Sequence, residues 1–127
     1  RVFVEGLYRA SARDFRLEGG YIYAVTDELP AVHGDPTLEE AYFRTAKELV
    51  KDIAGGESKI SKELDAALTG VSDPDTYINI CAHQMRLKDV VKQELLEETN
   101  LVRRLRFFEQ CLNTELEISR LERKIAQ

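Results

Sequence analysis

Two groups of residues in this sequence resemble parts of catalytic or ligand-binding motifs, and neither has the spacing that its chemistry requires. The segment Gly55-Gly56-Glu57-Ser58-Lys59 has the residue types of a phosphate-binding loop, but the wrong spacing and an acid beside the phosphate position. His33 stands in a linker, while Cys81 and His83 are two residues apart and face different sides of a helix. No Gly-x-Ser-x-Gly elbow is present. We therefore expect no catalytic residue, metal or cofactor here, and we read the two glycines as a helix stop.

Charged residues around position 100 are the second chemical feature. Glu97 and Glu98 close one expected helix while Arg103 and Arg104 open the next. Each pair opposes its helix dipole at a cost of roughly 0.3 to 1 kcal/mol per charge. Either the four charges pair across the turn, or Arg103, Arg104 and Arg106 form a patch for an acidic partner, polypeptide or nucleic acid. Both readings can hold together.

Composition limits the class of protein. The chain has 127 residues, 43% of them hydrophobic and 32% charged, which is typical of one folded domain. A net charge of -5 argues against broad attraction to phosphate backbones. Cys81 and Cys111 lie in helical apolar patterns, as buried thiols of a reducing compartment do. With no apolar run long enough to span a bilayer and no signal peptide at the start, we expect a soluble, cytoplasmic protein.

The first thirty residues have strand character. Residues 1–15 and 21–26 are rich in β-branched and aromatic residues, and residues 17–20 between them predict a hairpin turn. Gly6 is a candidate β-bulge. Because an isolated hairpin is marginally stable, we expect these strands to belong to a larger sheet whose other members precede residue 1.

The remaining chain predicts helices after a linker at residues 30–35. Thr37 and Glu40 form a capping box for a helix that ends at Gly55-Gly56. Ser61 can cap a short helix ending at Gly70. Asp73, followed by Pro74, predicts the N-cap of a third helix that buries an apolar face; that face consists of Tyr77, Ile78, Cys81 and Met85.

A fourth helix is expected over residues 87–98, burying Val90, Val91 and Leu95. After a break at Thr99-Asn100, residues 101–127 contain neither Gly nor Pro and predict one long helix. It carries two apolar stripes. The first is Leu101, Leu105, Phe108 and Leu112; the second is Phe107, Cys111, Ile118, Leu121 and Ile125. The helix has no closing signal, so we expect both ends of the chain to be cut from a longer protein.

Residues 1–10 (Arg-Val-Phe-Val-Glu-Gly-Leu-Tyr-Arg-Ala) resemble a strand motif of the N-terminal domain of Lon proteases. Further segments resemble the helical half of the same domain in the same order; they are Met85-Arg86-Leu87-Lys88, Lys92 to Glu97, Arg104-Leu105, Glu115-Leu116-Glu117 and Glu122 to Ile125. Arg86 departs from the family, which often has Pro there.

The resemblance implies an α+β, mainly α fold: the end of a PUA-like β subdomain at residues 1–30, then a helical subdomain at 31–127 with a long helix from about 101. It implies a non-catalytic part of an ATP-dependent serine protease that helps recognise unfolded or tagged proteins and assemble a homohexamer. Client contacts would be apolar, with Phe107, Phe108, Leu112 and Leu121 as candidates. The alternatives are a module for acidic partners or nucleic acid that uses Arg103, Arg104 and Arg106, and a structural coiled-coil spacer.

Overall fold

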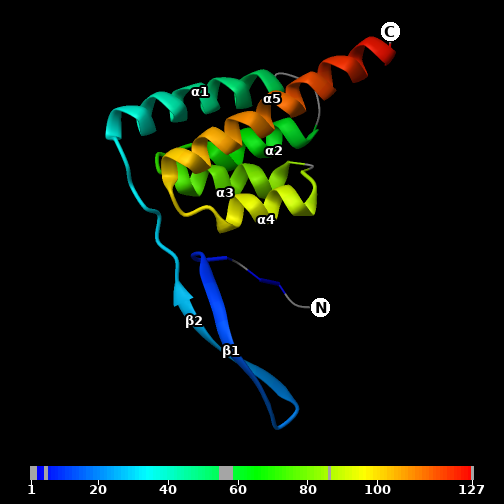
Figure 1. Cartoon of the computed structure of the whole chain (residues 1–127). Coiled ribbons are helices and arrows are strands. Elements are labelled where there is room, and N and C mark those ends of the chain that lie inside the picture. The colour runs from blue at the N-terminus through cyan, green and yellow to red at the C-terminus, as the bar shows by residue number, and fades with distance from the viewer. Residues whose placement is uncertain (1–2, 5, 55–58, 86, 127) are drawn as a thin grey trace. The chain divides into compact units, whose positions relative to one another are not determined.

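The computed structural model describes residues 3–4, 6–54, 59–85 and 87–126, which contain two strands followed by five helices (Figure 1). The fold is therefore α+β and mainly α, as the sequence predicts. The chain separates into two compact units, Arg1–Ala31 and Val32–Gln127.

The first unit is a β-hairpin. Strands β1 (Ala10–Glu18) and β2 (Tyr21–Glu28) pair antiparallel. Gly19 and Gly20 form the turn, which is shorter than the predicted turn at residues 17–20 because Leu17 and Glu18 belong to β1. Both glycines have positive φ, which glycine adopts without steric cost. The first strand begins later than predicted: the described residues before Ala10 are not in a strand, while Arg1, Val2 and Glu5 lie outside the described residues.

A bulge interrupts the hairpin at Asp14, not at Gly6 as expected. Arg13 pairs with Val25 and Arg16 with Tyr23, so two residues of β1 face one of β2. Asp14 has a φ of 54°, a conformation in which Asp is enriched among non-glycine residues. Gly6 belongs to no strand. An extra residue of this kind bends a strand and increases its twist.

The hairpin exposes apolar side chains on both faces. Leu17 pairs with Ile22, and by strand alternation both lie on the face opposite to Tyr21 and Tyr23. All four side chains are exposed. The larger sheet that would bury them stays a prediction.

Helix α1 (Pro36–Ala54) opens the second unit, and its N-cap differs from the predicted one. Asp35 Oδ1 accepts a hydrogen bond from the Thr37 amide at 2.8 Å, and Pro36 occupies the first helical position. Thr37 and Glu40 lie inside the helix, where the Glu40 carboxylate pairs with Arg44 at 2.6 Å. The capping-box prediction was therefore wrong by two residues. The predicted stop at Gly55-Gly56 lies outside the described residues.

Helices α2 (Lys59–Leu68) and α3 (Pro74–Gln84) follow. Ser61 lies within α2 instead of capping it, so that start was placed too late. Gly70 ends the segment with a φ of 81°. The N-cap of α3 is confirmed: Asp73 Oδ2 accepts from the Thr76 amide at 3.1 Å and from its hydroxyl at 2.7 Å. The four residues predicted for its apolar face are all buried.

Helix α4 (Asp89–Glu97) starts two residues later than predicted, and α5 (Leu101–Ala126) is the expected long helix. Leu95 is buried, as predicted, and Val91 is half-buried. Val90 is 69% exposed, so its expected burial was wrong. Thr99 and Asn100 form the break between the two helices.

The core of this unit lies between α1, α3 and α5. Helix α1 runs beside α5 in the most extensive helix contact, α3 also packs on α5, and α2 packs on α1 and α3 (Figure 1). The first stripe of α5 is entirely buried, which confirms its predicted docking on the other helices. None of the helices in the described segments is long and apolar enough to cross a membrane. The buried core residues are Phe43, Ala46, Val50, Leu64, Tyr77, Ile78, Cys81, Met85, Leu95, Leu101, Leu105, Phe108 and Leu112.

The linker is tied to the turn between α4 and α5. The Val32 amide donates to the Thr99 carbonyl at 2.7 Å, and the Leu101 amide donates to the Val32 carbonyl at 2.9 Å. These two bonds form a parallel bridge between Val32 and Asn100. Val32 is thus the first residue held by the helical unit.

Candidate functional site

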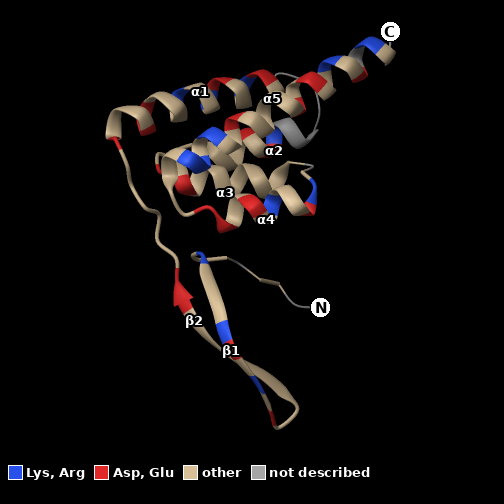
Figure 2. Cartoon of the chain, viewed as in Figure 1, with Lys and Arg blue, Asp and Glu red and all other residues tan. Residues whose placement is uncertain are grey.

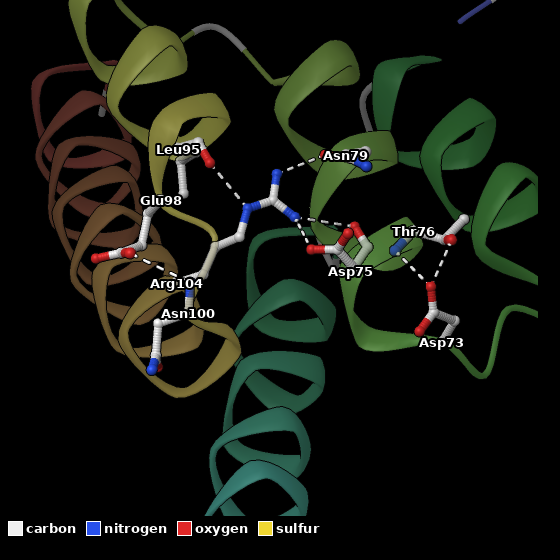
Figure 3. A network of polar contacts seen from close by, with 8 residues as sticks. All are labelled: Asp73, Asp75, Thr76, Asn79, Leu95, Glu98, Asn100 and Arg104. Atoms are coloured by element: carbon white, nitrogen blue, oxygen red, sulfur yellow. Dashed lines mark hydrogen bonds and ion pairs between the residues drawn. The ribbon is translucent and has the colours of Figure 1, made fainter. Parts of the chain in front are cut away.

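The most polar buried point of the helical unit is the Arg104 guanidinium, in the first turn of α5 (Figure 3). Arg104 is 1% exposed. Nε donates to the Leu95 carbonyl at 2.8 Å, Nη1 to the Asp75 carbonyl at 3.2 Å and to the Asp75 carboxylate, and Nη2 to the Asn79 side-chain oxygen. One side chain of α5 therefore holds groups of both α3 and α4.

Two partners of Arg104 lie at helix ends, where each accepts a hydrogen bond from this cationic donor. Leu95 lies in the last turn of α4, where backbone carbonyls lack an N–H donor within the helix. Asp75 lies in the first turn of α3, where the helix dipole also favours a negative charge. Because a buried charge is costly without a partner, the ion pair and the hydrogen bonds account for the burial of this arginine.

This network accounts for the arginines at the N-terminus of α5, where the helix dipole disfavours positive charge. Arg104 finds its counter-charge on α3, and Asn100 Oδ1 accepts from the Arg103 amide at 3.1 Å. The Glu98 carboxylate accepts from the Asn100 amide at 3.2 Å, and that of Glu97 from the Gln93 amide group at 3.1 Å. These contacts involve Asp75, Gln93 and Asn100 as well as the charged residues that the sequence pattern singled out.

The three arginines proposed as a patch are not equivalent. Arg103 and Arg106 are exposed, and the Arg106 guanidinium lies 5.9 Å from the centre of the Tyr42 ring. Arg104 is buried in the network above and is therefore not part of a surface patch. A patch for an acidic partner would consist of Arg103 and Arg106.

The four apolar candidates also divide into core and surface. Phe108 and Leu112 are fully buried and belong to the core. Phe107 is half-buried, and Leu121 is 59% exposed. Only Phe107 and Leu121 could touch another molecule without a rearrangement of the core.

Phe107 lies in a shallow depression between α4 and α5. Glu94, Glu97 and Glu98 line it together with Phe107, and its volume is about 340 Å³. Next to it, the pKa of the Cys111 thiol is raised by burial and by the charge of Glu94. An aromatic face beside carboxylates suits contact with apolar and basic side chains, and it disfavours thiolate chemistry at Cys111.

The distal turns of α5 carry the second stripe to the surface. Exposure rises along it, and Ile125 is 84% exposed. Both acidic and basic residues occur along these turns (Figure 2). No group of three or more His, Cys, Asp or Glu residues suited to a metal occurs within the described segments.

Comparison with known proteins decides the family. The family model "ATP-dependent protease La (LON) substrate-binding domain" matches residues 1–114. The chain belongs to this family. The matched range includes the first unit and residues 32–114 of the second, with the Arg104 network and Phe107, whereas Leu121 and Ile125 lie beyond it.

Several curated Lon proteases are similar to this LON substrate-binding domain. Identity is 32% over 100% of this chain for "Lon protease 1" of Bacillus subtilis (strain 168), and 30% over 98% for "Lon protease" of Clostridioides difficile (strain 630). It is 27% over 98% for "Lon protease" of Escherichia coli (strain K12). In each case the chain spans 16% of the relative's length.

Proposed function

We propose that this chain is the substrate-recognition module of an ATP-dependent Lon-type serine protease and that it contacts unfolded or tagged proteins. The observation that carries the proposal is the match of residues 1–114 to the LON substrate-binding domain. The ATPase and the Ser-Lys peptidase would be parts of the same parent protein, which would act as an ATP-dependent endopeptidase in the cytoplasm.

Within this function, Phe107 is the candidate contact with clients in the helical unit. It lies in the matched range, it reaches the surface, and its ring stands beside three carboxylates. Unfolded proteins share exposed apolar side chains, and a shallow aromatic surface binds many of them weakly.

We assign assembly of the parent protease to the end of the second stripe of α5. Ile118, Leu121 and Ile125 follow the spacing of three and four residues that pairs helices, and all three are exposed. Self-association through these residues would support a homohexameric parent. A strict monomer in sedimentation experiments at high concentration would contradict this part.

The recognition role is tested with a fluorescently labelled, reduced and carboxymethylated unfolded protein. The intact chain should bind it, and Phe107→Ser should weaken binding by about three- to tenfold, which corresponds to roughly 0.7 to 1.4 kcal/mol. Val90→Ser is the matched control, because Val90 is an exposed apolar residue of α4. Thermal melts by circular dichroism must show that both variants are folded. Absence of binding by the intact chain would reject the recognition role.

Nucleic acid is the second candidate partner, and it rests on Arg103 and Arg106, which are exposed. Salt-dependent DNA binding that is lost in an Arg103→Glu/Arg106→Glu variant would favour it over recognition of unfolded protein.

A further inference from the structure

A cleft between α1, α2 and α3 shares no lining residue with the depression at Phe107 and is a candidate binding site. Val50 and Leu64, both buried, form part of its apolar lining. Its volume is about 190 Å³. Since an apolar cavity of roughly 150 Å³ accepts one benzene molecule, this cleft has room for one large aliphatic or aromatic side chain.

Two cations stand on one wall. Lys47 and Lys51 are one helical turn apart on the face of α1 that lines the cleft. The ammonium group of Lys47 lies 4.4 Å from the centre of the Phe43 ring. Neither lysine forms an ion pair with an acid in the part of the chain that the structure describes. This wall therefore carries two positive charges beside an apolar space.

The opposite wall and the α3 side supply other polar groups. Asp65 of α2 lines the cleft and is exposed. Tyr77 of α3 also lines it and is 5% exposed, yet within the described residues its hydroxyl has no hydrogen-bond partner. Burial, then the charges of Cys81 and Asp65, raise the pKa of Tyr77 above its usual range.

We propose that this cleft binds the C-terminal residue of a polypeptide whose last side chain is apolar. The side chain would occupy the space between Val50 and Leu64, and the terminal carboxylate would meet Lys47 and Lys51. The last peptide N–H could donate to Asp65. One residue with a free carboxylate thus satisfies an apolar, a cationic and an acceptor group that the cleft presents together. The inference rests on the proposed recognition function and gives it a substrate class.

The test uses the whole chain and fluorescein-labelled heptapeptides of Gly and Ser that end in Leu as the free acid, in Leu as the amide, or in Ser as the free acid. Fluorescence anisotropy at low salt should show the Leu acid binding at least about fivefold more tightly than the other two, as expected for charge-assisted bonds beside an apolar contact. Equal affinity for acid and amide would overturn the proposal.

Variants then locate the effect. Lys51→Glu should remove the preference for the acid over the amide, and Thr69→Trp, which places an indole at an exposed lining position, should weaken the Leu acid. Lys124→Glu, the same charge change on the far turns of α5, should change neither. An equal loss of the preference for the acid in Lys124→Glu would assign the effect to net charge and overturn the cleft proposal.

The unfolded protein used to test the recognition role separates the two proposals. If it binds the intact chain and the Lys51→Glu chain equally while the heptapeptides show no preference, the cleft proposal fails and recognition stands. If the intact chain binds neither the unfolded protein nor any heptapeptide, both fail.

Discussion

Replacing Arg104 by Met tests whether the buried guanidinium holds the helical unit together. Methionine keeps much of the side-chain length but removes the charge and every donor. The change removes the donors that Arg104 supplies to the Leu95 carbonyl, the Asn79 oxygen and the partly buried Asp75 carboxylate. Removing one partner of a buried ion pair typically costs about 3 to 5 kcal/mol.

A loss of that size is large for a chain of this length. We expect the free energy of unfolding from urea titrations to fall by about 3 to 5 kcal/mol, with a fall in Tm of roughly 10 to 20 °C. Arg103→Met is the matched control, because Arg103 is exposed one position earlier in the same helix. It should change the free energy of unfolding by no more than about 0.5 kcal/mol.

A double-mutant cycle assigns the loss to the network. Asp75→Asn removes the negative charge that faces Arg104, so Arg104→Met/Asp75→Asn should be less destabilised than the sum of the single variants by about 1 kcal/mol or more. Strictly additive losses, or an Arg104→Met chain as stable as Arg103→Met, would refute the account of α3, α4 and α5 held by one side chain.

Three further predictions concern packing, capping and pH. Leu112→Ala should lower the free energy of unfolding by about 2 to 5 kcal/mol and Leu121→Ala by less than about 0.5, since only Leu112 is buried; equal losses in urea titrations would contradict this. Asp73→Ala should cost about 1 kcal/mol through the lost N-cap of α3, whereas Asp73→Asn should keep most of it. Burial raises the pKa of Cys81 from 9.0 to about 12, so above about pH 9 the unfolded chain loses a proton that the folded chain retains. The contribution of the buried Cys81 thiol to the free energy of unfolding is then fully present below pH 9 and falls by about 1.4 kcal/mol per pH unit up to pH 12. In urea titrations at pH 8 and 10.5, the free energy of unfolding should therefore fall less in the Cys81→Ala chain.

The start of a helix could be predicted from the sequence where a single local capping signal determines it. Asp73 before Pro74 has one structural meaning, an N-cap followed by the first helical residue, and the structure confirms it. The same pair occurs at Asp35-Pro36 and caps α1, but only the capping box of Thr37 and Glu40 was predicted there. Two overlapping capping signals cannot be ranked by spacing alone, because the choice depends on which φ and ψ the preceding linker adopts.

The hairpin shows a different limit. Apolar and aromatic residues before Ala10 predicted a strand that is absent from the described residues there, since strand formation depends on a partner and not on propensity alone. The bulge at Asp14 likewise depends on the register with β2. Val90 illustrates the same point on a helix, because its exposure is set by which face of α4 meets α5.

The Arg104 network was the main omission, and the sequence contained a signal for it. Arg104 lies three residues after Leu101 and four before Phe108, so it stands on the buried stripe of α5. A cation on a core-facing position must have a buried counter-charge. That this partner is Asp75, 29 residues earlier, could not be derived without the packing of α3 on α5.

The two hydrogen bonds of Val32 determine where an autonomous helical fragment would have to start. A shortened chain that begins at Val32 retains the carbonyl that accepts a hydrogen bond from the Leu101 amide. A chain that begins at Pro36 lacks this carbonyl, so the first amide of α5 would have to bond to water. Deletion of only four residues ahead of α1 would therefore loosen a helix whose sequence lies some seventy positions away.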